Sequence, residues 1–231
     1  MSRRMSELFD SYQGSYGAVV QSSIDFSGLP HSFFMRAKAD LLRDLVERRL
    51  GGRKPAMLDV GCGVGSFHPF LRDMTTRLCG IDVSKASITQ ARSDHPEAEY
   101  QDFDGKTFPY ESGTFDLVTA ICVLHHVTPV LWHGFTREMR RVVKPGGLVC
   151  VIEHNPFNPL TRLAVSRCEF DNDAVLLRAR QTRRLMANAG LRALGSRYFL
   201  LFPWAAKLAR RAEFALRHVP LGAQYATWGT V

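Results

Sequence analysis

The segment MLDVGCGVGSF, residues 57–67, constrains the fold of this chain more than any other stretch. In it an apolar run leads into three glycines at alternate positions, Gly61, Gly63 and Gly65. Glycine has no Cβ, so it permits positive φ angles and lets a ligand approach the backbone closely. The segment therefore predicts a buried strand that turns around a ligand into a helix, whose unpaired N–H groups would face a carboxylate or a phosphate.

Short apolar runs alternate with helical patterns from this segment to about residue 155, as in a parallel sheet covered on both faces. We predict strands at 56–60, 77–82, 98–102, 115–122, 148–153, 191–200 and 224–229, and helices at 36–50, 66–74, 85–93, 129–143, 180–189 and 204–217. Ser84 is a plausible N-cap, and the KPGG sequence at 144–147 should end a helix and turn the chain into the next strand. The fold class is thus α/β, a Rossmann-like, doubly wound sheet of seven strands.

Length and composition set the broad class. The chain has 231 residues, of which 45% are hydrophobic, and this suits one globular domain. It contains no apolar run of eighteen residues, so we expect no transmembrane segment, and the polar N-terminus does not resemble a signal peptide. Five dispersed cysteines without a CxxC pair are typical of a reducing compartment, so we expect a cytoplasmic protein.

Charge is unevenly distributed along the chain. Residues 1–156 hold eighteen basic and eighteen acidic side chains, whereas residues 157–231 hold twelve basic and four acidic ones and so carry the whole net charge of +8. Such asymmetry is informative about partners rather than about the fold. Either the last third presents a basic face only to solvent, or it meets an anionic partner.

The spacing of the glycines narrows the choice of ligand. A dinucleotide-binding turn reads G-x-G-x-x-G, whereas this turn reads D-x-G-x-G-x-G, with Ser66 at the place of the third dinucleotide glycine. Asp59 would repel a pyrophosphate but suits an α-amino group. Asp82, at the end of the next strand, can accept hydrogen bonds from a ribose diol. An amino-acid nucleoside therefore fits better than NAD.

Four segments, LDVGCGVG, GIDVS, DGKTFPYESGTFDLVTAICVLHHV and EMRRVVKPGGLVCVIEHN, resemble the successive motifs of class I S-adenosylmethionine-dependent methyltransferases. The similarity is to the small-molecule (type 11-like) branch that includes quinone-biosynthesis enzymes, and it covers residues 57–154 in the expected order. This resemblance implies a seven-stranded, mostly parallel sheet with an antiparallel last strand, in agreement with the strand count. It also implies S-adenosylmethionine as the cofactor.

The resemblance also implies roles for individual residues. Around the methionine portion it places the turn residues and Asp59, and around the ribose and adenine it places Asp82, Val83 and Gly105. The acidic residue at the adenine edge is Asp104, whose spacing to Pro109 fits better, or else Asp102. At the end of the fourth strand Ala120 and Ile121 would offer backbone groups. The cofactor-binding residues implied are Asp59, Gly61, Cys62, Gly63, Gly65, Asp82, Val83, Asp104, Gly105, Ala120, Ile121 and Tyr16. Tyr16 and Tyr12, in FDSYQGSY, resemble the flap that closes over the cofactor, although Gly17 replaces its common acidic residue.

Methyl transfer to a hydroxyl needs alignment and a group that accepts the proton. The candidates are His125 and His126, after the fourth strand, and His154, after the fifth, because substrates bind beyond the carboxyl ends of such strands. Each of these histidines could instead only shape the site. Cys122 and His125 have metal-ligand spacing, but no second Cys/His pair follows, so the sequence predicts no metal site.

The acceptor is less defined than the cofactor. The fourth strand lacks the Pro-Pro stretch of enzymes that methylate exocyclic base nitrogens, and the chain has no Pro-Cys pair, which argues against a nucleic acid. Residues 204–218 form a basic amphipathic pattern beside the aromatic YFLLFPW. This pattern suits a membrane surface or an anionic amphiphile through 198–218, or else an ordinary helix packed on the sheet. We expect O-methylation of a small or lipid- or sugar-linked, anionic acceptor, with nitrogen and carbon as the alternative acceptor atoms.

We expect a single domain, 1–231, in three parts: an N-terminal helical lid (1–50), a cofactor-binding core (51–156) and a basic acceptor-side portion that completes the sheet (157–231). Two other functions compete with methyl transfer. One is a non-catalytic cofactor-binding or adaptor protein with the same fold, and the other is an NAD-dependent oxidoreductase, which the glycine spacing disfavours.

Overall fold

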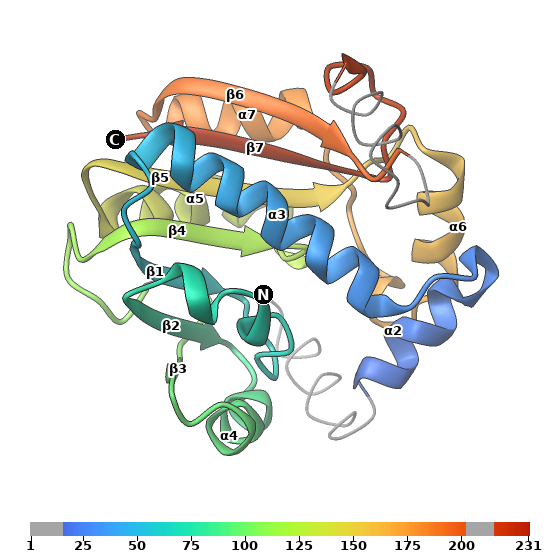
Figure 1. The fold of residues 1–231 in the computed structure, drawn as a ribbon, viewed down its shortest axis with the longest axis horizontal. Helices are drawn as coiled ribbons and strands as arrows, with labels where there is room; N and C mark the ends of the chain where they lie inside the picture. Colours follow the sequence, from blue (N-terminus) through green and yellow to red (C-terminus); the bar gives the residue numbers. More distant parts are fainter. Residues whose placement is uncertain (1–15, 202–214) are drawn as a thin grey trace.

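A computed structural model describes residues 16–201 and 215–231 of the chain. Its centre is a seven-stranded sheet with the order β3-β2-β1-β4-β5-β7-β6 (Figure 1). The strands are β1 (Ala56–Val60), β2 (Arg77–Asp82), β3 (Glu99–Asp102), β4 (Phe115–Ile121), β5 (Val143–His154), β6 (Arg192–Phe199) and β7 (Gln224–Thr230). Only β7 runs antiparallel to its neighbours, β5 and β6. The predicted fold class and the antiparallel last strand are confirmed.

Helices cover both faces of the sheet. On one face lies α3 (His31–Leu50), and on the other lie α5 (Trp132–Val142) and α7 (Ala179–Asn188) (Figure 1). Successive residues of a strand pack into the hydrophobic cores on opposite faces of the sheet. Met57 packs with α3, and Leu58 packs with α5 and α7. A strand buried on both faces is mainly apolar, so the central strands could be recognised in the sequence as nearly continuous apolar runs.

The remaining helices lie at the edges. The short α4 (Lys85–Asp94) packs beside β3, and its predicted cap is present because Ser84 Oγ accepts the N–H of Ser87 at 3.0 Å. Two helices that the sequence patterns did not predict, α2 (Tyr16–Ile24) and α6 (Pro159–Arg167), lie together near the carboxyl ends of the strands (Figure 1). The predicted helix at 204–217 lies almost entirely outside the described residues.

One predicted helix is wrong. Residues 66–74 do not form a continuous helix but two short 3-10 turns, η2 (His68–Phe70) and η3 (Arg72–Met74). Pro69 has no N–H to donate, and the His68 side chain is drawn inward, where its Nδ1 lies 2.6 Å from Tyr100 Oη. β5 also begins earlier than predicted, at Val143, and the KPGG residues interrupt its register with β4.

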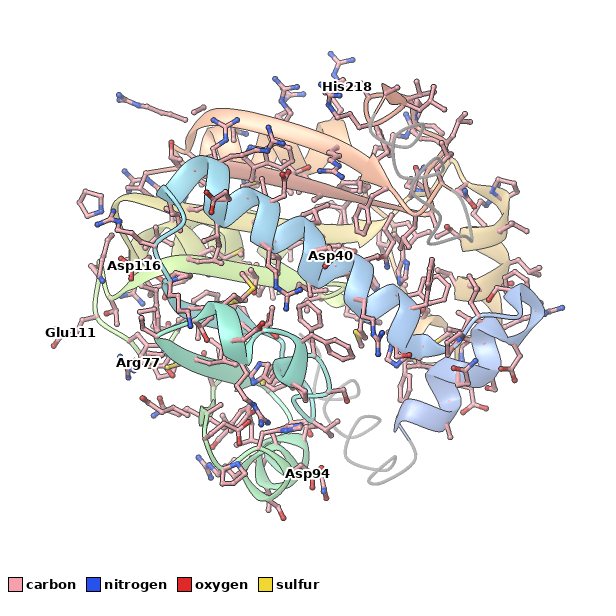
Figure 2. All side chains as sticks on the ribbon, in the orientation of Figure 1. Asp40, Arg77, Asp94, Glu111, Asp116 and His218 are labelled. Atoms are coloured by element: carbon pink, nitrogen blue, oxygen red, sulfur yellow. The ribbon has the colours of Figure 1, made fainter. Side chains whose placement is uncertain are left out.

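The sheet has an amino edge, where the parallel strands begin, and a carboxyl edge, where they end, and the two differ in character. Figure 2 shows Arg77, Glu111 and Asp116 grouped at the edge where the central strands begin. There Arg77 pairs with Glu99 and Asp116 pairs with Lys144, on the surface. The carboxyl edge, in contrast, contains the reversal of strand order between β1 and β4, which is where α/β sheets bind ligands.

Candidate active site at the carboxyl edge of the sheet

A cavity of about 190 Å³ opens at this reversal of strand order. Its walls come from the ends of β1, β2, β4 and β5 and from α2, α3 and α6. Among the residues that line it are Asp59, Gly61, Cys62, Gly63, Asp82, Ile121, His125, His126 and His154, all of them predicted site residues. The fold thus brings six of the predicted cofactor residues and the three predicted catalytic histidines into one space.

The glycine turn follows β1 and has the predicted backbone geometry. Gly61, Gly63 and Gly65 have φ angles of 75°, 54° and 74°. A Cβ on Gly61 would come within 2.5 Å of a Val123 methyl group, whereas a Cβ on Gly63 would meet nothing within 4 Å. Gly61 is therefore required by close packing, and Gly63 leaves open space on the cavity side.

Asp82 is buried and fixed against the glycine turn. Its Oδ2 accepts the N–H of Gly63 and its Oδ1 accepts the N–H of Ser84, each at 2.9 Å. Burial raises the pKa of this carboxyl, and the backbone hydrogen bonds oppose the rise. The carboxylate is held rigidly at the cavity wall, in a position where a diol could donate to its remaining lone pairs.

Asp59 lies within the end of β1 and is also buried. Thr119 Oγ1 donates to Asp59 Oδ1 at 2.8 Å, and His68 Nε2 lies 3.4 Å from Asp59 Oδ2. Two side chains thus orient this carboxylate, which faces the same cavity as the glycine turn. Cys62 lines the cavity too, and burial raises the pKa of its thiol.

A smaller hollow adjoins the first one. Asp82, Val83, Phe103 and Gly105 line it, and Val83 and Gly105 are the residues predicted around the adenine. Asp104 is exposed and does not line either space. Its Oδ1 accepts the N–H groups of Lys106 and Thr107, in the same loop, at 2.8 Å each. These hydrogen bonds lower the pKa of Asp104. Its role at the adenine edge stays a prediction.

Three other predicted cofactor residues need separate mention. Ala120 is fully buried inside β4, between β1 and β5, while Ile121, at the strand end, reaches the cavity. Gly65 belongs to the turn without lining the cavity. Tyr16 begins α2, but its side chain, like the whole of Tyr12, lies outside the described residues.

His125 is locked between two carboxylates. Its Nδ1 lies 2.5 Å from Glu153 Oε2, and its Nε2 lies 3.2 Å from Asp171 Oδ1. Glu153 is itself anchored, because its Oε1 accepts the N–H groups of Val123 (3.1 Å) and Leu124 (2.7 Å). Burial lowers the pKa of His125, but the two carboxylates outweigh burial and hold the pKa well above its usual value.

Two further imidazoles stand beside His125. His126 Nε2 lies 3.4 Å from Asp171 Oδ1, and the ring of His154 lies 5.1 Å from that of His125, centroid to centroid. Burial and then the charge of His125 lower the pKa of His126 to about 3. Burial raises the pKa of Asp171, but the hydrogen bond from His125 and the charges of the histidines lower it to about 2.

Cys122 and Lys38 complete the cavity wall. Lys38 Nζ lies 3.8 Å from Cys122 Sγ, and Gln224 Nε2 lies 3.4 Å from the same sulfur. Burial raises the pKa of this thiol, but Lys38 and His154 outweigh burial and bring it to about 7. Cys122 directly follows β4 with a φ of 57°, a left-handed conformation uncommon for a residue with a side chain.

Sequence reasoning missed Lys38 and Asp171 as residues of this site. Lys38 belongs to an amphipathic helix on which any lysine can be a solvated one, and Asp171 is one of several acidic residues after α6. No local pattern distinguishes them. Their positions follow from the packing of α3 and of η6 (Glu169–Asp171) against the strand ends.

Comparisons with known proteins agree with this geometry. The family model described as a methyltransferase domain matches residues 58–151. An uncharacterized methyltransferase of Synechocystis is 31% identical over 103 residues, which are 44% of this chain and 49% of that protein. Malonyl-[acyl-carrier protein] O-methyltransferase of Pseudescherichia vulneris is 32% identical over 120 residues, 52% of this chain and 45% of that one. The chain thus spans about half the length of these curated relatives.

Solved structures show the same fold over nearly the whole chain. A methyltransferase structure from Thermotoga maritima covers 97% of this chain and 98% of its own, with a TM-score of 0.66 and 16% identity. A second, from Archaeoglobus fulgidus, covers 87% of this chain and 100% of its own, with a TM-score of 0.61 and 13% identity. At these identities the likeness concerns the fold.

Proposed function

We propose that this chain, whose residues 58–151 match the family model described as a methyltransferase domain, is an S-adenosylmethionine-dependent enzyme that transfers a methyl group from that cofactor to a small or lipid-linked acceptor. The observation that supports this most directly is the single cavity shared by the glycine turn, Asp82 and the histidines. A cofactor held by the turn and by Asp82 would present its sulfonium within the same enclosed space as an acceptor beside the histidines. In-line methyl transfer mainly needs such alignment.

In this proposal the acceptor atom is an oxygen. A hydroxyl must lose its proton as the methyl group arrives, and a histidine within hydrogen-bond reach can take that proton. Both ring nitrogens of His125 already face carboxylates, which makes His125 a positioning residue in the proposal. The proton acceptor is then one of the two neighbouring histidines, His126 or His154.

The proposed acceptor carries an anionic group. Residues 157–231, predicted to lie on the acceptor side, carry the net positive charge of the chain. Among the relatives, one is named for a malonyl group on an acyl carrier protein, and another, from Pseudomonas paraeruginosa, for ubiquinone biosynthesis. Both relatives are O-methyltransferases by name, in keeping with an oxygen acceptor for this chain.

We further propose that the protein works in the cytoplasm and touches membranes only peripherally. No helix in the ranges 16–201 and 215–231 has both the length and the apolarity needed to cross a bilayer. The basic segment 198–218 is the proposed contact with an anionic surface, and most of it lies outside the described residues.

Calorimetric titration with S-adenosylmethionine, S-adenosylhomocysteine and NADH tests the cofactor assignment first. We expect micromolar binding of the two sulfur compounds and none of NADH. Asp82→Ala should weaken binding at least tenfold, because the carboxylate facing the ribose is lost, while Asp94→Ala, on the exposed side of α4 (Figure 2), should leave it unchanged.

The outcomes separate the competing functions. An unchanged dissociation constant in the Asp82 variant would remove the ribose assignment. Tight binding of S-adenosylhomocysteine without turnover on envelope-precursor, quinone-like or sugar acceptors would favour a cofactor-binding adaptor. Binding of NADH alone would make the protein an oxidoreductase.

A further inference from the structure

We propose that His125, His154 and Asp171 form a binding site for one divalent transition-metal ion at the acceptor side of the cavity. One ligand atom from each of these side chains lies within 4.8 Å of the other two. The pattern of the sequence predicted no metal, because it offers no paired Cys/His motif. The proposed ligands come instead from three separate segments that only the fold brings together.

His125 is oriented as metal-binding histidines are. Its Nδ1–H donates to Glu153, and Glu153 is fixed by two backbone N–H groups of the segment that carries the histidine. A carboxylate behind the ring sets the tautomer and leaves Nε2 free to bind a cation on the other side. In His125 that other nitrogen faces Asp171, toward the cavity.

The distances around Asp171 suit a shared cation. Its Oδ1 lies 3.2 Å from His125 Nε2, and a ring nitrogen of His154 lies within 4.8 Å of the ligand atoms of both. Ligands bonded at about 2.1 Å to a tetrahedral or octahedral ion are about 3.0–3.4 Å apart. A cation could therefore enter with small side-chain movements, chiefly of His154.

The number of imidazoles also favours a cation over an ion pair alone. His125 by itself is enough to bridge Glu153 and Asp171. The structure adds two more rings, His126 at 4.1 Å and His154 at 5.1 Å from His125 between centroids. Imidazole is the side chain that most often binds transition metals, so three rings around one carboxylate fit a cation between them.

The donor set indicates which ions are suitable. Imidazole nitrogens with one carboxylate favour Zn²⁺, Fe²⁺, Mn²⁺ or Co²⁺ over Mg²⁺ and Ca²⁺, which prefer oxygen ligands. Three protein ligands leave coordination positions open on the cavity side. An acceptor with two adjacent oxygens, such as a vicinal diol or a hydroxyl beside a carbonyl, could fill them.

The consequence for catalysis rests on the proposed methyl transfer. A cation bound to an acceptor hydroxyl lowers the pKa of that hydroxyl and orients it toward the methyl group. The proton of the hydroxyl would then leave to water at the open side of the cavity, and His126, which is not among the three proposed ligands, would accept a hydrogen bond from the acceptor. The site would thus select acceptors that chelate.

The test uses the full chain without a histidine tag, freed of metal by dialysis against a chelator. Titration with Zn²⁺ is followed by calorimetry, and titration with Co²⁺ by the visible absorption of the bound ion. We expect one ion per chain with micromolar or tighter affinity. Asp171→Asn and His154→Gln should each weaken binding by about 100-fold or more, because both remove a ligand. His133→Gln, which alters an exposed histidine outside the cavity, should bind as the unaltered protein does.

The absence of stoichiometric metal binding would overturn the proposal. So would a metal affinity of the Asp171 and His154 variants equal to that of the unaltered protein. Two variants are used so that a loss of folding in one, detected by circular dichroism, leaves the other to decide. Binding of S-adenosylhomocysteine to the metal-free protein is measured in parallel. If that compound binds and metal does not, only the metal site fails; if metal binds and S-adenosylhomocysteine does not, the proposed function fails and the metal site remains.

Discussion

At the scale of single residues, Lys38 shows how the fold gives a side chain its importance. Its side chain is buried at the cavity wall, with Nζ 3.8 Å from Cys122 Sγ. A buried ammonium is costly unless an anion or hydrogen-bond acceptors compensate it. The amino-acid end of the proposed cofactor offers a carboxylate, and Asp59, predicted to hold its amino group, lines the same cavity.

We therefore expect Lys38→Met to weaken binding of S-adenosylhomocysteine by about 10- to 100-fold, since a hydrogen bond to a charged group contributes about 1.5–3 kcal/mol. Binding of 5′-methylthioadenosine, which lacks the amino-acid portion, should not change. Calorimetry measures the binding affinity of both compounds. The matched control is Lys54→Met, which alters an exposed lysine outside the cavity. If the Lys38 variant binds S-adenosylhomocysteine as tightly as the unaltered protein does, Lys38 does not hold the carboxylate of the cofactor. Lys38 would then be available to bind the acceptor.

At the scale of structural elements, the turn after β1 joins the sheet to the site. Gly61 and Gly63 share a positive φ, so alanine at either position costs about 1–2 kcal/mol of backbone strain. They differ in their surroundings, because only a Cβ on Gly61 would collide with Val123. One glycine serves packing and the other keeps the ligand space open.

Gly61→Ala should accordingly lower the free energy of unfolding by about 1–3 kcal/mol more than Gly63→Ala does, as overpacking typically costs. Urea denaturation measures the difference. In a Val123→Ala background the extra cost of Gly61→Ala should largely disappear, since the colliding methyl groups are gone. A cost that is the same in both backgrounds would show that strain, rather than the collision, dominates. For Gly63→Ala, the loss in free energy of cofactor binding should exceed the loss in free energy of unfolding.

At the scale of the whole molecule, the uneven charge coincides with exposed apolar side chains. Phe157, Leu160 and Leu163, at and just before α6, are exposed, and so is Leu221. These segments touch, because Asn158 Nδ2 donates to the carbonyl of Leu221 at 2.7 Å. Arg162 and Arg167 lie on the same helix. Apolar side chains among arginines suit an anionic lipid surface.

We expect the protein to bind vesicles of anionic lipid more tightly than neutral vesicles, and more tightly at low salt, because salt screens the attraction. Cosedimentation over a salt series measures this binding. Leu160→Ser combined with Leu221→Ser should reduce it severalfold, while Val130→Ser, which alters an exposed valine on η5 (Pro129–Leu131), should not. Equal partition to neutral vesicles, or no binding at all, would remove the membrane contact.

The sequence by itself determined the sheet and one side of the cavity. The central strands are apolar because both faces are buried, so β1 and β2 were predicted to the residue. The glycine turn and Asp82 were also readable, since a turn that admits a ligand needs glycine within a few residues of the strand end. All of these signals are local.

Only the tertiary structure decided what the other side of the cavity contains. His125 meets Glu153 28 residues away and Asp171 46 residues away, and Lys38 meets Cys122 84 residues away. Neither α2 nor α6, which close that side, showed a pattern strong enough to predict. Periodicity reports which face of an element is buried, whereas the partners of a buried charge depend on which loops the completed sheet brings to its carboxyl edge.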